Sequence, residues 1–343
     1  MQRCLELAKL GAGSVAPNPM VGAVLVYNDR IIGEGWHRWY GEAHAEVNCI
    51  NSVKEEDKGL ISGSTLYVSL EPCAHFGKTP PCTGLIMQHK IPKVVIGCRD
   101  PFEEVNGKGI EKLKAAGVEV VLVTGTIEEE CKKLNKRFFT FHTKHRPYVI
   151  LKWAQTADGK IASGSTERLM ISNEYSNRLV HQWRSEEAGI LVGTNTALLD
   201  NPELTTRLWP GNSPVRLVVD MDLKLPPGLK IFNQQARTIV FNTVKQDETG
   251  NLVYYKIKKE ETLVPQIMNA LYQLKIQSVL VEGGAKLLQS FIDERIWDEA
   301  RVITNEEQII NEGLAAPVLK NARVISEQKL LSDKVITYTL KDS

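Results

Sequence analysis

Short apolar runs alternate with helix-like periodicity along the first half of the chain. Residues 21–27 form a continuous apolar run, and residues 30–36 return after an Asn-Asp pair, which predicts two adjacent strands. The same reasoning places further strands at 65–70, 93–97 and 118–123, and helices at 5–10, 44–53, 109–116 and 127–142, with a further helix starting at Pro81-Cys82. Strands that alternate with helices in this way are typical of an α/β sandwich with a largely parallel sheet.

The pattern restarts after a short polar segment that ends in proline, residues 144–147. Strands are expected at 148–154, 189–193, 215–220, 238–241 and 278–282, and helices at 173–187, 194–199 and 285–292. The polar, lysine-rich stretch 246–261 predicts an exposed hairpin. Since 343 residues are enough for two cores, we expect two α/β domains, 1–145 and 146–343.

Composition narrows the class of protein. The chain is 43% hydrophobic and 24% charged, as in ordinary globular proteins, and its net charge of +1 gives no electrostatic case for a nucleic-acid partner. No run of about 18 apolar residues predicts a membrane span, and the charged N-terminus does not resemble a signal peptide. Six cysteines in a chain of this length indicate reduced thiols, so we expect a cytoplasmic protein.

A histidine and two cysteines carry the clearest chemistry. His44, Cys73 and Cys82 are three ligands, the number that a catalytic zinc uses when its fourth position is left for water. Glu46 lies two residues from His44 and is not needed to complete the ligand set. Its natural role is a proton shuttle between water and a leaving amine. Zinc deaminases use the same set of ligands and the same proton shuttle, and their usual signature is H-x-E followed by P-C-x-x-C.

The cysteine spacing departs from that signature, because eight residues separate Cys73 from Cys82. The segment between them must leave the metal and return to it, and it carries His75 and Lys78. His75 could supply a substrate contact or a ligand. We expect Lys78 to bind the phosphate or ribose of the substrate, because both ends of its loop are ligands.

The stretch from Leu70 to Cys82 closely resembles the bifunctional riboflavin-biosynthesis enzymes, in which a pyrimidine deaminase is fused to a pyrimidine reductase. Residues 16–23 and 41–47 fit the same family. The resemblance implies a cytidine-deaminase-like α/β/α sandwich for the first domain. It also implies that Asn18 and His37 lie beside the pyrimidine, although Asn18 alone would be read as a turn residue and His37 as a surface histidine.

The second half lacks G-x-G-x-x-G after its first strand, which speaks against a Rossmann domain. Gly283-Gly284 lies between a strand and a helix, where it could cradle a phosphate or simply form a tight turn. Residues 151–152, 156–160, 192–196, 200–207 and 281–284 resemble the reductase part of the family. That part has a dihydrofolate-reductase-like fold and uses NADPH.

The resemblance also implies site residues in the second domain. On the cofactor side these are Ala154, Thr196, Asp200, Gly283 and Gly284, and on the substrate side Arg184, Leu204, Arg207 and Glu282. Arginine suits a phosphorylated ribose because its guanidinium group can bind two phosphate oxygens at once. Many family members carry tryptophan where this chain has Met170, so contacts of Arg168 and Met170 are not transferred.

The implied chemistry has two steps on a small phosphorylated pyrimidine. Zinc (Zn2+) and water remove an amino group from a diaminopyrimidinone ribosylamine phosphate, and NADPH then reduces the ribosyl group to a ribityl chain. Spacing alone identifies no acid or base in the second domain. The family implies a dimer or a tetramer, but no stretch of this sequence identifies an interface.

Two other classes of function compete with this interpretation. A tRNA deaminase would share the zinc chemistry, but the low net charge and the long cysteine spacing count against it. A structural zinc module fused to a nucleotide-binding domain would need a fourth protein ligand, for which His75 and Cys49 are the nearby candidates.

Overall fold

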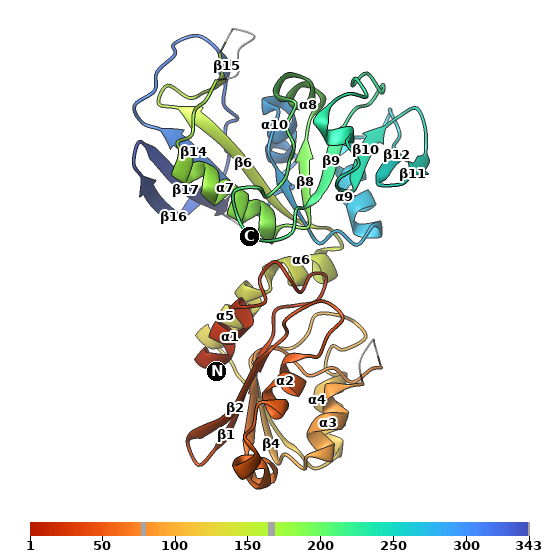
Figure 1. Ribbon diagram of the computed structural model, residues 1–343, viewed down its shortest axis with the longest axis vertical. Coiled ribbons are helices and arrows are strands. Elements are labelled where there is room, and N and C mark those ends of the chain that lie inside the picture. The colour runs from red at the N-terminus through yellow and green to blue at the C-terminus, as the bar shows by residue number, and fades with distance from the viewer. Residues whose placement is uncertain (77–79, 164–168, 342–343) are drawn as a thin grey trace. The chain divides into compact units, whose positions relative to one another are not determined.

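The computed structural model describes residues 1–76, 80–163 and 169–341, and Lys78 and Arg168 lie outside them. The chain divides into two compact units, Met1–His145 and Arg146–Ser343. Each unit has its own sheet with helices packed on it (Figure 1). Both units are therefore α/β, as the sequence predicts.

The N-terminal unit contains α1 (Gln2–Lys9), β1 (Gly22–Tyr27), β2 (Arg30–Trp36), α2 (Ala45–Asn51), the 3-10 helix η1 (Glu55–Gly63), β3 (Thr65–Val68), α3 (Cys82–Gln88), β4 (Lys93–Ile96), α4 (Lys108–Ala115), β5 (Glu119–Leu122), α5 (Thr126–Leu134) and α6 (Lys136–Lys144). Its five strands lie in the order β2-β1-β3-β4-β5.

Only half of this sheet is parallel, so the expectation of a largely parallel sheet is wrong. β3, β4 and β5 run parallel, whereas β1 is antiparallel to both β2 and β3. The cause is the two-residue turn Asn28-Asp29, in which both residues have positive φ, 44° and 59°. Such a turn reverses the chain into a hairpin and leaves no room for a crossover helix.

Helices cover both faces of the N-terminal sheet. On one face, α2, α3 and α4 contribute Ile50, Ile86 and Leu113 to a core that also contains the strand residues Leu25 and Leu66. On the other face, α1 and α5 pack through small clusters around Leu5, Cys131, Cys4 and Leu7. The unit is therefore a three-layer α/β/α sandwich, as the family resemblance implies.

The helix expected over 127–142 is in fact two helices that meet at Asn135. The Asn135 side chain is buried, accepts a hydrogen bond from Met20 N at 2.8 Å and donates one to Met20 O at 2.9 Å. This asparagine bonds to a distant backbone segment, and its own backbone leaves the helical conformation there. Nothing in the local periodicity predicts this break.

The C-terminal unit contains β6 (Tyr148–Thr156), β7 (Lys160–Ala162), α7 (Glu174–Glu186), β8 (Gly189–Val192), α8 (Thr194–Asp200), β9 (Val215–Val219), the 3-10 helix η2 (Lys230–Phe232), β10 (Thr238–Asn242), β11 (Asp247–Thr249), β12 (Leu252–Lys256), α9 (Leu263–Gln273), β13 (Ser278–Val281), α10 (Ala285–Asp293), β14 (Glu299–Asn305), β15 (Leu314–Ala315), β16 (Ala322–Leu330) and β17 (Asp333–Leu340).

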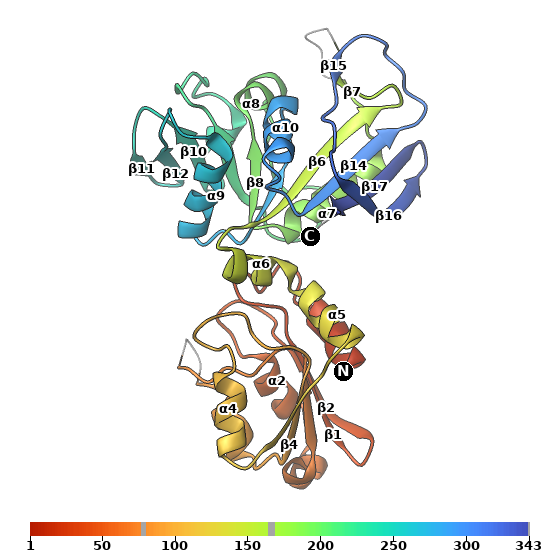
Figure 2. The same ribbon diagram turned by 180° about the vertical axis from the view of Figure 1, so that it is seen from behind.

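Ten of these strands form one sheet in the order β11-β12-β10-β9-β8-β13-β6-β14-β17-β16. Alternate residues of the central strands face opposite cores, so that Leu191 lies under α9 and α10 whereas Ile190 packs with Ala197 of α8. Figures 1 and 2 show α7 on one face of the sheet and α9 and α10 on the other. Because β13 runs parallel to both β6 and β8, the carboxyl ends of these three strands lie at the same end of the sheet.

Sequence periodicity predicts part of this sheet and misses its end. The expected hairpin in 246–261 is confirmed as β11 and β12. The strands β14, β17 and β16 are not predicted, because their residues mix charged and apolar types and β16 is exposed along most of its length.

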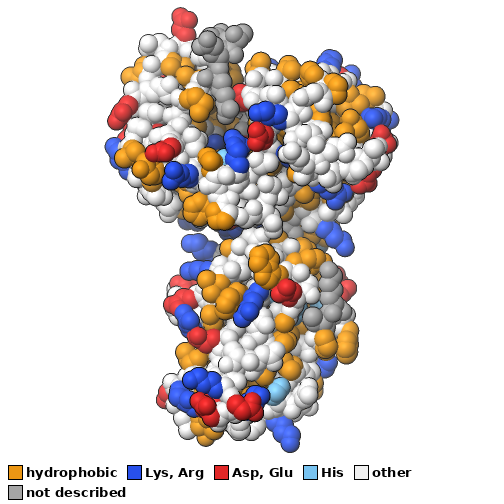
Figure 3. Space-filling view, viewed as in Figure 1, with side chains coloured by type: hydrophobic (Ala, Val, Ile, Leu, Met, Phe, Trp, Pro, Cys, Tyr) orange, Lys and Arg blue, Asp and Glu red, His pale blue; other side chains and the backbone are white. Residues whose placement is uncertain are grey.

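The described helices are all too short or too polar to cross a membrane. On the face in Figure 3, basic and acidic side chains are interspersed.

Candidate active sites

Three metal-binding side chains converge in the N-terminal unit. The Sγ atoms of Cys73 and Cys82 lie 3.6 and 3.4 Å from Nδ1 of His44, and the three donor atoms all lie within 4.8 Å of one another. His75 and Cys49 do not join this group in the described part of the chain. The cluster therefore offers three donors, which is the number expected of a catalytic zinc site.

Two helix starts bring these donors together. His44 is the N-cap residue of α2, and Cys82 is the first residue of α3, directly after the N-cap Pro81. The backbone N–H of Cys82 donates to Sγ of Cys73 at 3.3 Å. The hydrogen bond with the Cys82 thiol lowers the pKa of Cys73 to about 4, and His44 also lowers it. Such a thiolate is the form that binds a metal ion.

Glu46 lies in the first turn of α2 and is only 3% exposed. Burial raises the pKa of its carboxyl group, which also forms a hydrogen bond with the Cys82 thiol. A histidine nitrogen, two thiols and an adjacent buried carboxyl are the set that a zinc ion with a reactive water requires. The residues present therefore fit the metal.

Asn18 and His37 form a pair beside the cluster. Nδ1 of His37 lies 3.1 Å from the Ala43 carbonyl, its Nε2 lies 3.1 Å from Nδ2 of Asn18, and its ring centre lies 5.4 Å from that of His44. His37 is 3% exposed, so the pattern-based reading of a surface histidine is wrong. Nδ1 of His75 is buried and has no hydrogen-bond partner among the described residues.

Sequence reasoning missed the role of Glu71, which precedes the Pro72-Cys73 pair. Its buried carboxylate accepts hydrogen bonds of 3.0–3.3 Å from four backbone N–H groups, those of Asp100, Gly107, Gly109 and Ile110. A Cβ atom on Gly109 would lie 2.1 Å from the Pro72 carbonyl oxygen. Glu71 thus holds the segment before α4 against the turn that carries Cys73.

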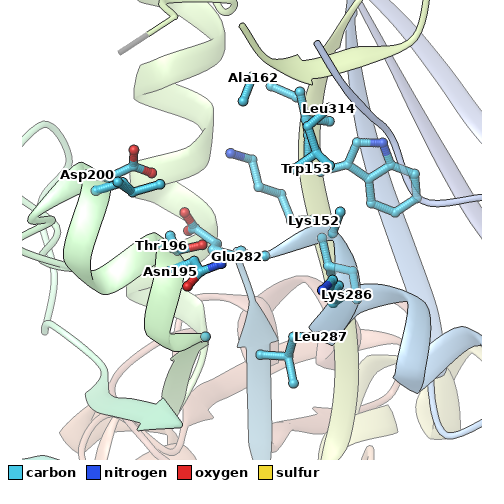
Figure 4. A pocket seen from close by; sticks show the side chains of 18 of the residues that line it. Lys152, Trp153, Ala162, Asn195, Thr196, Asp200, Glu282, Lys286, Leu287 and Leu314 are labelled. Atoms are coloured by element: carbon cyan, nitrogen blue, oxygen red, sulfur yellow. The ribbon is translucent and has the colours of Figure 1, made fainter. Parts of the chain in front are cut away.

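The C-terminal unit contains a pocket of about 680 Å³ at the carboxyl ends of its central strands. All five predicted cofactor residues line it, namely Ala154, Thr196, Asp200, Gly283 and Gly284. In Figure 4, Thr196 and Asp200 project from α8 on one side, and Lys286 and Leu287 lie on α10 on the other. Ligands bind preferentially at such strand ends in α/β sheets.

The glycine turn between β13 and α10 is closely packed. A Cβ atom on Gly283 would lie 2.7 Å from Cγ2 of Thr196, and Gly284 has φ of +77°, which favours glycine. Because α10 starts directly after this turn, its free backbone N–H groups point into the pocket region. Together with Lys286 they fit the phosphates of a dinucleotide such as NADPH.

Arg184 and Glu282 form a buried pair. Nε and Nη2 of Arg184 donate to the two carboxylate oxygens of Glu282, each at 2.7 Å, and Nη1 donates to the Thr205 carbonyl at 3.2 Å. Burial would raise the pKa of Glu282, but Arg184 and Lys152 hold it below its usual value. Much of the Arg184 guanidinium group is therefore already engaged by protein acceptors.

The remaining substrate-side predictions lie outside the lining of the pocket. Leu204 is buried in the core, and Arg207 is about half exposed with its Nη1 3.7 Å from the Glu203 carboxylate. Sequence reasoning missed Lys152, whose ammonium group extends into the pocket near Glu282 (Figure 4). A charged residue within an otherwise apolar strand was the available signal.

Comparisons with known proteins match both units. Residues 1–98 match the cytidine and deoxycytidylate deaminase zinc-binding region, and residues 147–305 match the RibD C-terminal domain. The riboflavin biosynthesis protein RibD of Aquifex aeolicus is 39% identical over 98% of this chain and 94% of its own length. RibD of Bacillus amyloliquefaciens is also 39% identical, over 87% of this chain and 81% of its own length.

Two solved structures resemble the whole chain. One is a diaminohydroxyphosphoribosylaminopyrimidine deaminase/5-amino-6-(5-phosphoribosylamino)uracil reductase from Thermotoga maritima, with a TM-score of 0.88 and 38% identity over 99% of this chain and 97% of that one. The other is Acinetobacter baumannii RibD, with a TM-score of 0.89 and 30% identity over 98% and 97% of the two chains. The three-donor cluster, the pocket that fits a dinucleotide and these matches all indicate the same family. The chain belongs to the RibD family of riboflavin-biosynthesis enzymes, which are both deaminases and reductases.

Proposed function

We propose that the unit Met1–His145 deaminates a phosphorylated diaminopyrimidine by hydrolysis and that the unit Arg146–Ser343 reduces the ribosyl group of the product with NADPH. One chain contains both a three-donor cluster beside a buried glutamate and a glycine-lined pocket. This combination is the observation that carries the proposal. The name of the Thermotoga maritima relative supports this class of substrate.

In the deaminase unit, His44, Cys73 and Cys82 would hold zinc, which when bound acts as a Lewis acid that activates water at neutral pH. Glu46 would accept a proton from the attacking water and deliver it to the departing amine. Its position in the first turn of α2 keeps the carboxyl group beside the cluster and away from solvent. A buried carboxyl suits this task because its raised pKa brings it closer to the operating pH.

Four further residues would bind the deaminase substrate, namely Asn18, His37, His75 and Lys78. The contact between His37 and the Ala43 carbonyl leaves Nε2 facing the Asn18 amide, which fixes the orientation of that amide. Asn18 would then hydrogen-bond the pyrimidine, and His75 would face it from the loop between the two cysteines. Lys78 would bind phosphate or ribose from the same loop.

In the reductase unit, Ala154, Thr196, Asp200, Gly283 and Gly284 would bind NADPH, which when bound supplies a hydride. Arg184, Leu204, Arg207 and Glu282 would bind the ribosyl substrate. Opening of the sugar requires a proton at its ring oxygen. Lys152 places an ammonium group in the pocket beside Glu282, where it can supply that proton.

We further propose a cytoplasmic enzyme whose partners are small phosphorylated pyrimidines and not nucleic acids. The reduced thiols of the zinc cluster and the net charge of +1 support these statements. We also propose a homo-oligomer, a dimer or tetramer. β16 is an exposed edge strand with Val324 and Ile325 about half exposed, and such an edge can pair with a second copy. Light scattering of the purified protein tests the assembly.

The variant Glu46→Gln tests the division of labour. It should keep its zinc, measured by metal analysis, and lose deamination by roughly a hundred- to ten-thousand-fold, the usual contribution of a general acid–base group. It should oxidise NADPH at near the wild-type rate when it is given the deaminated intermediate. With the amino substrate alone it should oxidise almost none.

Glu42→Gln is the matched control, since Glu42 is exposed and lies only four residues away. This variant should retain both activities. The proposal fails if Glu46→Gln deaminates normally, or if a folded and zinc-loaded Glu46→Gln protein loses both activities.

A further inference from the structure

Two segments of the C-terminal unit line the cofactor pocket, although the proposed function assigns no role to either. One is the stretch 169–172, which leads into α7, and the other is the connection 306–316, which follows β14 and contributes Leu314. Met170 and Leu314 are large apolar side chains that are 62% and 52% exposed. In Figure 4, Leu314 lies beside Ala162 of β7 at the wall of the pocket. These two segments thus add apolar surface to the pocket.

The side chain of Asn305 joins the two segments. Its Nδ2 donates to the Ile171 carbonyl at 2.7 Å, and its Oδ1 accepts hydrogen bonds from the backbone N–H groups of Glu307 and Gln308 at 3.1 and 3.2 Å. These partners fix the orientation of the amide, because a carbonyl can only accept and an N–H can only donate. Asn305 is the last residue of β14, which runs parallel to β6, so it lies at the pocket end of the sheet.

Other contacts fix the path of the connection beyond its first residues. The Asp158 carboxylate, between β6 and β7, accepts a hydrogen bond from the backbone N–H of Asn311 at 2.9 Å. Further along, β15 pairs with β7, with Leu314 opposite Ala162. The connection is therefore held at its middle and at its end by β7 and the turn before it, whereas Asn305 holds its start.

The stretch 169–172 is held in a similar way at its other end. Asn173 caps α7 with its own side chain and also donates to the Leu330 carbonyl at 2.7 Å. The bond from Asn305 to the Ile171 carbonyl is thus the side-chain contact directly beside Met170. Loss of this bond would release the backbone next to Met170, while the start of α7 would stay in place.

We propose that Asn305 is a positioning residue of the cofactor pocket. Its amide holds the stretch 169–172 and the start of the connection 306–316 together, so that Met170 and Leu314 line the pocket at the same time. Asn305 does not itself line the pocket and acts through these two segments. This inference rests on the proposed function, which assigns the pocket to NADPH.

The test measures NADPH binding to the full-length enzyme by fluorescence titration. Asn305→Asp keeps the size of the side chain and one oxygen for the N–H groups of Glu307 and Gln308, but it places a second oxygen against the Ile171 carbonyl. It should raise the Kd for NADPH about fivefold to tenfold, as expected for one lost hydrogen bond. Its kcat at saturating NADPH should stay within about twofold of wild type. Asn305→Ala, which loses both contacts, should raise the Kd at least as much.

Asn251→Ala is the matched control. Nδ2 of Asn251 also donates to a distant backbone carbonyl, that of Gln234, at 2.9 Å, but Asn251 lies between β11 and β12 and does not line the pocket. This variant removes the same kind of contact and should leave the Kd for NADPH unchanged. If Asn305→Asp does not fold, Asn305→Ala decides alone, because alanine places no oxygen against Ile171.

Gly283→Ala, measured in parallel, separates failure of the cofactor assignment from failure of the positioning role. An unchanged Kd in Gly283→Ala overturns the assignment of NADPH to this pocket and this inference with it. A raised Kd in Gly283→Ala with a wild-type Kd in the folded Asn305 variants overturns the positioning role alone. An equal rise in Asn251→Ala also overturns that role, because any lost contact of this kind would then have the same effect.

Discussion

Replacing Glu282 with glutamine should strongly destabilise the C-terminal unit. The Glu282 carboxylate accepts two hydrogen bonds of 2.7 Å from Arg184, and the side chains of Arg184 and Glu282 are only 13% and 6% exposed. Glutamine is nearly the same size but has no charge, so the Arg184 guanidinium would be left buried without a counter-charge. Removing one partner of a buried ion pair costs about 3–5 kcal/mol.

Urea unfolding followed by tryptophan fluorescence measures this change. Trp183 and Trp297 are buried in the C-terminal unit and report its transition. At pH 7.5 the transition of Glu282→Gln should move to lower urea with an unchanged slope, since the exposed surface on unfolding is the same. A double-mutant cycle with Arg184→Met should show that the two single costs do not add, because each variant removes the same pair.

The matched control is Glu174→Gln, which breaks an exposed ion pair on α7, the helix that also carries Arg184. Glu174 and Arg178 are 3.6 Å apart and 67% and 59% exposed, and such pairs contribute less than about 0.5 kcal/mol. The cost of Glu282→Gln also has a defined pH dependence. Because the pKa of Glu282 lies below its usual value of about 4.3, the pair stabilises the unit above that pH and is lost as the pH falls through the folded pKa.

A loss below about 1 kcal/mol in Glu282→Gln, or an equal loss in Glu174→Gln, would refute the reasoning. The pair would then be no more important than a surface contact, despite its burial.

Two further changes test other parts of the structure. Gly283→Ala should raise the KM for NADPH about tenfold or more and leave deamination intact, because the new Cβ would meet Thr196 at 2.7 Å. Gly228→Ala is the control, since the space around Gly228 is open. Equal kinetics in the two variants would contradict the packing argument. Burial raises the pKa of Asp100 to about 7, so its charge opposes folding increasingly as the pH rises from about 4 to 7. Asp100→Asn should therefore stabilise the N-terminal unit at pH 8, by at most about 4 kcal/mol, and not at pH 4. Thermal unfolding at both pH values measures the change in stability. A variant that is less stable than wild type at pH 8 would contradict the prediction.

Local sequence was sufficient for many of the helices and strands and for the three-donor cluster. The apolar run 21–27 and the periodicity of 174–186 each depend on neighbours within a few residues, and so do the turn and capping preferences around them. Two of the three predicted zinc ligands, His44 and Cys82, lie at helix starts, and the short spacing between His44 and Glu46 is visible in the chain itself. The turn Gly283-Gly284 in the C-terminal unit is also visible in the local sequence, and its residues line the pocket together with Thr196.

Tertiary structure alone decided how distant segments meet. Local periodicity cannot predict that Asn135 bonds to Met20, 115 residues away, or that Arg184 pairs with Glu282 across 98 residues. It also cannot predict the parallel pairing of β14 with β6. The physical reason is that helix and strand patterns record which face of a segment is buried, whereas the partner on that face is chosen by packing and by hydrogen bonds that must be satisfied between segments far apart in the chain.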